Sequence, residues 1–199
     1  MKKILDVNKL IEEYSDNQRG VFSLGDLKNI IDGNNSLIYR IIDKLSEAGI
    51  LNQFCRGFYI TEKFDLKTLN QRICSESYIS FGNVLADNLL IGSVPNYRVM
   101  SVKLGKSRIY NDSKYTVDQR GIKKELFFGY KIENGIKIAT AEKAFLDVIY
   151  FYQKGMKFSF DIYNDIDIEG LDKNLVLKYL KKYKNKIFIT LVKELLNGN

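Results

Sequence analysis

The sequence predicts an α+β protein in two parts, a group of three helices closed by a β-hairpin and then a mixed domain of small antiparallel sheet and helices. Before residue 49, apolar residues recur three times at helical spacing, and the period then changes from 3.6 to 2. Beyond residue 75, alternating strand-like segments are interspersed with amphipathic helical ones. We place the boundary in a polar stretch, which gives domains 1–70 and 71–199.

The first helical segment is predicted from apolar spacing, and the second from a capping motif and apolar spacing. The first is indicated by four apolar residues at helical spacing, Val7, Leu10, Ile11 and Tyr14. Before the second, Ser23 and Asp26 have the spacing of a capping box, in which each side chain accepts a hydrogen bond from the other residue's backbone N–H. This second helix is expected to bury Leu24, Leu27, Ile30 and Ile31.

The third helical segment is expected to begin at a cap on Asn35 or Ser36, after the Gly and Asn residues of 32–35 interrupt the second. It runs to Glu47 or Ala48, and Gly49 ends it. Five apolar residues fall on one side, which must pack against the first two helices. These are Ile38, Ile41, Ile42, Leu45 and Ala48.

The polar side of this third segment is divided along its length. Its N-terminal half carries Asn35, Ser36, Tyr39 and Arg40, with Lys44 at the flank one turn further on. Two carboxylates, Asp43 and Glu47, lie beyond that half. A DNA recognition helix enters the major groove by its N-terminal residues. The pattern therefore predicts base reading by the first four of these side chains, and the alternative is an ordinary solvated helix.

A β-hairpin is predicted after Gly49. Residues 50–54 and 58–61 have strand character, and Cys55-Arg56-Gly57 joins them. Gly57 supplies the backbone freedom of a tight turn, which places Arg56 at the tip, where it could reach a phosphate or the minor groove. Three helices followed by such a hairpin predict a winged helix-turn-helix. Residues 62–74 are expected to be a linker with some helical tendency.

The second part combines helices and strands. Ser80 is expected to cap a short helix through Asp87, and residues 97–103 alternate as a half-buried strand. Residues 125–132 and 136–140 predict a hairpin across Asn134-Gly135. Thr140 can then cap a helix with a Lys143–Asp147 pair and an apolar face of Phe145, Leu146, Val148, Ile149 and Tyr152. Two further helices are indicated by Leu175, Val176, Tyr179 and Leu180, and by Ile187, Phe188, Leu191, Val192 and Leu195.

The net charge of +7 indicates a polyanionic partner, but the charge is unevenly distributed. Residues 1–70 are neutral, whereas residues 71–199 hold 21 basic and 14 acidic side chains. Eight of the basic residues lie in segment 98–124. We therefore expect phosphate contacts from this segment, at Arg98, Lys103, Lys106 and Arg108. The alternative is a basic surface that serves solubility alone.

Several classes of enzyme are excluded because the sequence contains no histidine, which rules out a Ser-His-Asp triad, a Cys-His pair and an imidazole metal site. No Walker loop and no dinucleotide-binding glycine pattern occur. Asp165 and Asp167 could assist a metal ion, but a solvated loop is favoured for them. We expect a protein that is not an enzyme, with no catalytic residue, metal or cofactor.

A cytoplasmic location is expected. No apolar run reaches the roughly 18 residues of a membrane span. Asp6, Asn8 and Lys9 interrupt any apolar core of a secretion signal. Cys55 and Cys74 have no metal-ligand spacing and are expected to be reduced thiols.

Short motifs in both parts resemble the AbiEi antitoxin family over roughly residues 20–152. The first part contributes Phe22-Ser23-x-x-Asp26-Leu27, Leu45-x-x-x-Gly49-Ile50-Leu51 and Arg56-Gly57-Phe58-Tyr59. The second contributes Tyr78-Ile79-Ser80-Phe81 with Leu85, then Phe128-Gly129, then Ile138-Ala139-Thr140-Ala141-Glu142-Lys143-Ala144-Phe145-Leu146-Asp147. Each motif is degenerate by itself, and their order carries the resemblance. Ala141 departs from the proline expected before the Glu-Lys pair, although a first helical turn accepts both residues.

This resemblance implies an antitoxin of a bacterial type IV toxin–antitoxin system, linked to abortive phage infection. Family members repress their own operon by binding inverted repeats in promoter DNA, and they counter a nucleotidyltransferase-like toxin without needing a stable complex. One alternative is a solitary winged-helix regulator whose second domain senses a ligand or partner. Another is an enzyme acting on nucleic acid or nucleotide through carboxylates such as Asp165 and Asp167.

Overall fold

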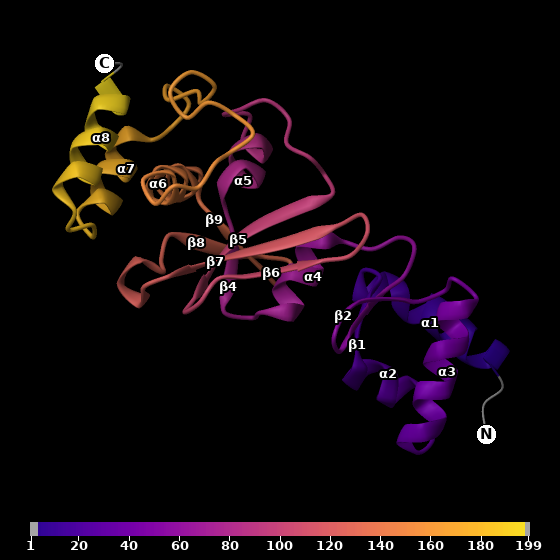
Figure 1. Cartoon of the computed structure of the whole chain (residues 1–199). Helices are drawn as coiled ribbons and strands as arrows, with labels where there is room; N and C mark the ends of the chain where they lie inside the picture. The colour runs from indigo at the N-terminus through magenta and orange to yellow at the C-terminus, as the bar shows by residue number, and fades with distance from the viewer. Residues whose placement is uncertain (1–3, 198–199) are drawn as a thin grey trace. The chain divides into compact units, whose positions relative to one another are not determined.

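The computed structural model describes residues 4–197, with side chains from Val7 onward, and it is a mixed α+β protein (Figure 1). Residues 1–3, part of the segment tested for a secretion signal, lie outside the described residues. The chain divides into two compact units. Unit 1 comprises the described residues up to Ile73 together with Tyr110–Thr116, and unit 2 comprises Cys74–Ile109 and the described residues from Val117 onward.

Unit 1 is built from helices and one small sheet. Its elements are α1 (Ile4–Gln18), β1 (Val21–Ser23), α2 (Leu24–Ile30), α3 (Asn35–Glu47), β2 (Asn52–Cys55), β3 (Phe58–Ile60) and α4 (Leu66–Ile73). The expected hairpin of β2 and β3 is present, and β1 adds a third strand that pairs antiparallel with β3. Gly20 precedes β1 with φ +70°, and a Cβ there would lie 2.1 Å from the carbonyl oxygen of Lys63. Glycine is therefore required where the chain enters this sheet.

The helix starts in unit 1 are fixed by side-chain caps. The expected capping box at α2 is confirmed, because Ser23 N donates to Asp26 Oδ2 at 2.6 Å and Asp26 N donates to Ser23 Oγ at 3.1 Å. The expected cap of α3 on Asn35 or Ser36 is wrong by one residue. Asn34 Oδ1 accepts the Leu37 N–H at 2.9 Å, since Asn34 keeps extended backbone while Asn35 is already helical.

The interpretation of residues 62–74 as a linker is also wrong for most of that stretch. Residues Leu66–Ile73 form α4, which buries Leu69 and Asn70. The guanidinium of Arg72 donates to the carboxylate of Asp26 and to two oxygens near β1, Gln18 Oε1 and the Val21 carbonyl. Hydrophobic periodicity does not predict these polar contacts of Arg72. They attach α4 to the start of unit 1.

Unit 2 contains most of a six-stranded mixed sheet, larger than the small antiparallel sheet expected. Its strands are β4 (Ser77–Ile79), β5 (Arg98–Leu104), β6 (Arg108–Asn111), β7 (Thr116–Ile122), β8 (Tyr130–Glu133) and β9 (Ile136–Ala139), in the order β6-β7-β5-β4-β9-β8. The expectation of antiparallel pairing is wrong at the centre. There β4 pairs parallel with β9 at Ile79 and Ile138. The β8–β9 hairpin is confirmed, but residues 124–126 form the 3₁₀ turn η1 (Lys124–Leu126) instead of a strand.

Helices line one face of the unit 2 sheet. They are α5 (Phe81–Asp87), α6 (Ala141–Tyr152), α7 (Lys173–Leu180) and α8 (Lys186–Asn197). Figure 1 shows α5 and α6 beside the sheet, and α7 and α8 on the outer side of α6. The expected cap on α6 is confirmed, because the Thr140 side chain accepts the Lys143 N–H. Two residues assigned to buried helix faces, Tyr152 and Ile187, are exposed.

The helices between residues 4 and 197 include none that is both long and apolar enough to cross a membrane.

Candidate nucleic-acid interface

Helix α3 has one buried side and one exposed side. Four of its five branched apolar residues, Ile38, Ile41, Ile42 and Leu45, are less than 7% exposed and join the core of unit 1, and the fifth, Leu37, is partly buried against that core. Ala48, expected on the same side, is the exposed C-cap residue. The buried stripe fixes the rotation of the helix, and the opposite side therefore faces solvent.

The residues predicted to read DNA occupy this solvent side. Asn35, Ser36, Tyr39, Arg40 and Lys44 are all exposed, and so are Asp43 and Glu47 further along. The first turn of α3 contains no acidic residue. The structure therefore places the five predicted side chains on one exposed face of the helix. The first four of them precede both carboxylates along the helix.

Helix α3 lies beside the β2–β3 hairpin. Tyr59 of β3 is almost completely buried, and its burial raises the pKa of its phenol above the ordinary value, with smaller contributions from Tyr39 and Asp43. Tyr59 also belongs to the same buried core as Ile38 and Ile42 of α3. The hairpin and the buried side of α3 therefore share one core.

The hairpin tip is held by the backbone. Gly57 adopts φ +84°, which only glycine takes without strain, and its carbonyl accepts the Leu24 N–H at 2.8 Å. This bond ties the turn to the start of α2. Arg56 is exposed at the tip, as predicted from the sequence. Cys55 beside it is a free thiol whose pKa is raised by burial, so it is not an activated nucleophile.

The predicted phosphate-contacting residues of unit 2 differ in their surroundings. The guanidinium of Arg98 pairs with Asp118, a fully buried carboxylate that also binds Arg120. Lys103 Nζ donates to the backbone carbonyls of Leu104, at 2.9 Å, and Lys106, at 3.3 Å. Lys106 and Arg108 are exposed. Arg98 and Lys103 therefore have intramolecular partners that the sequence did not reveal, and Arg108 also makes an intramolecular interaction.

A second polar cluster lies inside unit 2. The predicted Lys143–Asp147 ion pair of α6 is confirmed, but both side chains are completely buried. Tyr78 Oη donates to Asp147 at 3.0 Å. The hydroxyl of Ser80, expected to cap α5, instead donates to Asp147 at 2.8 Å. Lys143 Nζ also donates to Tyr183 Oη at 3.3 Å, so this network satisfies both charges from β4, α6 and the segment before α8.

Burial controls the protonation of this network. It lowers the pKa of Lys143 and raises that of Asp147, and in each case the opposite charge of the partner limits the shift. It also raises the pKa of the Tyr78 and Tyr183 phenols well above 10.0, with the Asp147 charge adding to the effect. The lysine lies 5.1 Å from the Phe128 ring centroid and 5.5 Å from that of Tyr78. A sequence signal existed for this burial, because the run from Ala141 to Tyr152 is apolar around most of the helix.

The remaining candidates form no site. Asp165 and Asp167 are exposed, and the described residues contain no group of three Cys, Asp or Glu side chains able to hold a metal ion. Cys74, like Cys55, is free.

Comparison of the sequence with known protein families gives no matching family, and comparison with curated proteins gives no match.

Proposed function

We propose that the protein is a DNA-binding transcriptional regulator in which unit 1 is a winged helix-turn-helix. In this proposal α3 is the recognition helix and the β2–β3 hairpin is the wing. One observation carries it: the solvent side of α3 has polar and basic side chains and no carboxylate through its N-terminal half, while its other side is locked into the core. A recognition helix contacts the bases of the major groove by its N-terminal residues, and carboxylates there would be repelled by the phosphates.

The side chains divide by chemistry into base-reading and phosphate-contacting groups. Amide, hydroxyl and guanidinium groups can bond base edges in the major groove, and we assign this role to Asn35, Ser36, Tyr39 and Arg40. Lys44 and Arg56 would contact phosphates beside them. Lys106, Arg108 and Arg98 of unit 2 are exposed candidates for further phosphate contacts, although Arg98 is paired with Asp118, and Lys103 is half-buried and bonded to two carbonyls.

The sequence resemblance supports a narrower role. We propose that the protein acts as an AbiEi-type antitoxin, which binds inverted repeats in its own promoter and counteracts a nucleotidyltransferase-like toxin. No stable complex with that toxin is assumed. The proposal also makes it a cytoplasmic protein without enzyme activity or cofactor. Expression of the neighbouring gene product, with and without this protein, tests the antitoxin role by growth, and unrelieved toxicity contradicts it.

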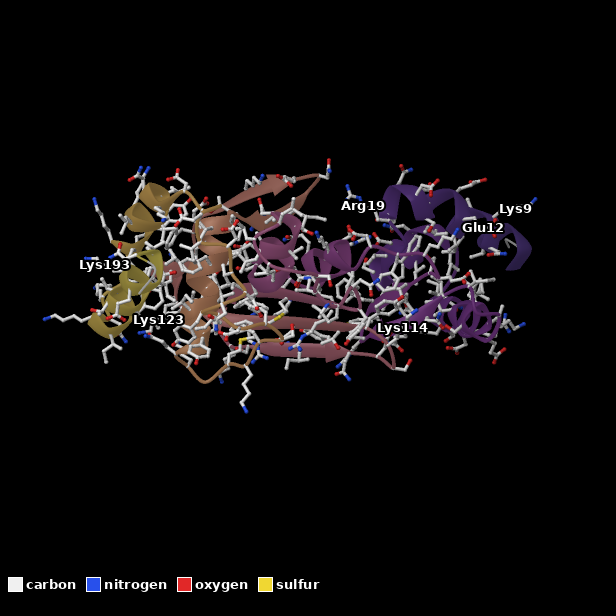
Figure 2. The ribbon with its side chains drawn as sticks, turned by 90° about the horizontal axis from the view of Figure 1, so that it is seen from above. Lys9, Glu12, Arg19, Lys114, Lys123 and Lys193 are labelled. Atoms are coloured by element: carbon white, nitrogen blue, oxygen red, sulfur yellow. The ribbon has the colours of Figure 1, made fainter. Side chains whose placement is uncertain are left out.

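Replacement of Arg40 tests the DNA-binding role. We expect Arg40→Ala to reduce the preference for operator over random duplex by about 1–3 kcal/mol, the value of one bidentate base contact. The measurement is titration of both duplexes at one salt concentration. Lys9→Ala removes an exposed positive charge from α1 and serves as the matched control (Figure 2).

The control should weaken binding to both duplexes equally, if at all, because it removes only a long-range charge. Unchanged operator preference in Arg40→Ala would remove Arg40 from the base-reading residues. Failure of the unmodified protein to bind its promoter at all would contradict the regulator proposal.

A second candidate function is a solitary regulator whose unit 2 senses a small ligand. It is favoured by a cavity of about 500 Å³ in unit 2, lined by lysine and aromatic side chains. A co-transcribed nucleotidyltransferase-like gene would argue against this candidate, and its absence would favour it.

A further inference from the structure

The unit 2 cavity of about 500 Å³ lies where η1, α6 and the segment joining α7 to α8 meet. That volume is in the range of pockets that hold small ligands. Figure 2 shows Lys123 at the end of the unit that carries α7 and α8. We call this space the lysine cavity and define it by its four lysines, Lys123, Lys154, Lys182 and Lys184.

The charge of the lysine cavity is strongly positive. All four lysines have exposed side chains, and Glu125 is the one carboxylate among the described lining residues. The lining therefore carries a formal charge of +3. Like charges around a concave surface repel one another and focus a positive potential into it. An anion with several negative charges would relieve that repulsion.

One wall of the cavity is aromatic and rigid. It contains Tyr150, Tyr183 and Phe188. The Tyr183 and Phe188 rings are stacked with centroids 4.5 Å apart, and Tyr150 meets Phe188 edge-on at 6.0 Å. The Tyr183 hydroxyl is bonded by the buried Lys143, so the ring is held from behind. Tyr183 and Phe188 are only 5% and 1% exposed, so the half-buried Tyr150 provides the accessible ring surface of this wall, and it offers apolar contact to a planar group.

Two of the lysines already lie over aromatic rings. Lys154 Nζ is 4.3 Å from the ring centroid of Tyr150, and Lys182 Nζ is 4.2 Å from that of Phe128. The Lys154 ammonium is therefore placed beside the Tyr150 ring that lines the cavity, whereas Phe128 is not one of the lining residues. A ligand that combines a planar ring with a charged group attached to it would contact both features together.

We propose that the lysine cavity binds a nucleotide, with its phosphates among the lysines and its base against Tyr150. The +3 charge of the lining suits a nucleoside di- or triphosphate. The same chemistry is offered by a free nucleotide and by the phosphorylated end of a nucleic-acid strand. This site is separate from the α3 face, and its existence does not depend on DNA binding by unit 1.

Calorimetric titration of the full chain with ADP and CDP tests the site. We expect at least one of them to bind more than tenfold more tightly than adenosine, cytidine or inorganic pyrophosphate, because each of those lacks one half of the ligand. A 5′-phosphorylated single-stranded pentanucleotide is titrated in parallel. Tighter binding of the free nucleotide identifies a metabolite, whereas at least tenfold tighter binding of the pentanucleotide identifies a strand end.

A charge-matched pair of variants locates the site. K154Q/K182Q removes two lysines of the cavity, and we expect it to weaken ADP or CDP binding at least tenfold. K178Q/K181Q removes two exposed lysines on and just after α7 that do not line it, and we expect affinity within twofold of the unmodified chain. Thermal unfolding checks that both variants are folded.

Three results would overturn the proposal: no binding of either nucleotide, equal affinity for pyrophosphate and nucleotide, or equal weakening by the two double variants. None of these outcomes depends on whether α3 binds promoter DNA, so the two proposals are tested separately.

Discussion

Helices α3 and α6 are of nearly equal length, 13 and 12 residues, yet they use charged residues in opposite ways. In α3 the basic residues Arg40 and Lys44 are exposed, while the apolar stripe alone is buried. In α6 the charged pair Lys143–Asp147 is completely buried within unit 2. A charge on α3 is available to a partner, whereas the charges on α6 are satisfied by the fold itself. Residue type alone does not distinguish a binding surface from an internal network, whereas the burial of the charged side chains does.

The largest expected effect comes from breaking the buried pair. Asp147→Ala leaves Lys143 buried without its counter-ion and removes the acceptor of Tyr78 and Ser80. We expect the free energy of unfolding to fall by about 3–5 kcal/mol, measured by urea denaturation of the full chain. Lys173→Ala removes one partner of an exposed pair at the same i,i+4 spacing and should cost less than about 0.5 kcal/mol.

The double variant Lys143→Met/Asp147→Leu sharpens this comparison. Because both charges are removed together, it should recover the part of the loss that comes from the unpaired Lys143 charge, but not the part that comes from the Tyr78 and Ser80 hydroxyls left without an acceptor. If Asp147→Ala proved no more damaging than Lys173→Ala, the pair would have to be accessible to water, contrary to the buried network. Promoter binding by the folded fraction should be unaffected by changes in α6.

A smaller effect is expected from Tyr78→Phe, and it depends on pH. Loss of the hydrogen bond to Asp147 should cost about 1–2 kcal/mol near neutral pH. Burial raises the pKa of Tyr78 well above 10.0, so above pH 10 the unfolded chain releases a proton that the folded protein keeps. The stability from this group is therefore full below pH 10 and decreases as the pH rises further.

In Tyr78→Phe the alkaline loss of stability should be shallower than in the unmodified protein, because Tyr183 alone then contributes it from this cluster. Urea denaturation at pH 8 and above pH 10 measures the difference. Parallel losses in the two proteins would contradict burial of the Tyr78 hydroxyl.

The smallest effect concerns three basic residues of unit 2, of which Lys106 and Arg108 are exposed and Lys103 is half-buried. Removal of one cation that neutralises a phosphate reduces the slope of log K against log salt by about 0.9. Replacing Lys103, Lys106 and Arg108 by Gln together should therefore flatten the slope by roughly 2–3 if they bind phosphates. Lys103 already binds two backbone carbonyls, so its share is expected to be the smallest. An unchanged slope would confine DNA binding to unit 1.

Local patterns were sufficient wherever neighbouring residues decide the structure. The Ser23–Asp26 capping box, the Thr140 cap and the α3 stripe from Ile38 to Leu45 were all predicted, because each involves residues three or four apart. The hairpin turn at Gly57 was predicted for the same reason. The five predicted residues on α3 are exposed together because helical spacing already places them on one face.

Long-range partners were not predictable in this way. Helix α4 lies where the sequence predicts a linker, since its anchor, Arg72, binds residues some fifty positions earlier. Arg98 was expected to be available to phosphates, but Asp118 on another strand pairs with it. The parallel pairing of β4 with β9 also joins segments far apart in the chain. The spacing of residues within one segment cannot predict contacts with a distant segment.

The sequence by itself determined the first three helices of unit 1, the polarity of α3 and the absence of histidine chemistry, since composition and short spacings suffice for all three. Only the tertiary structure decided that Lys143 and Asp147 are internal and that four lysines from separate segments surround one cavity. The physical reason is that the environment of a charge, and hence its availability to a ligand, depends on which distant segments the fold brings around it.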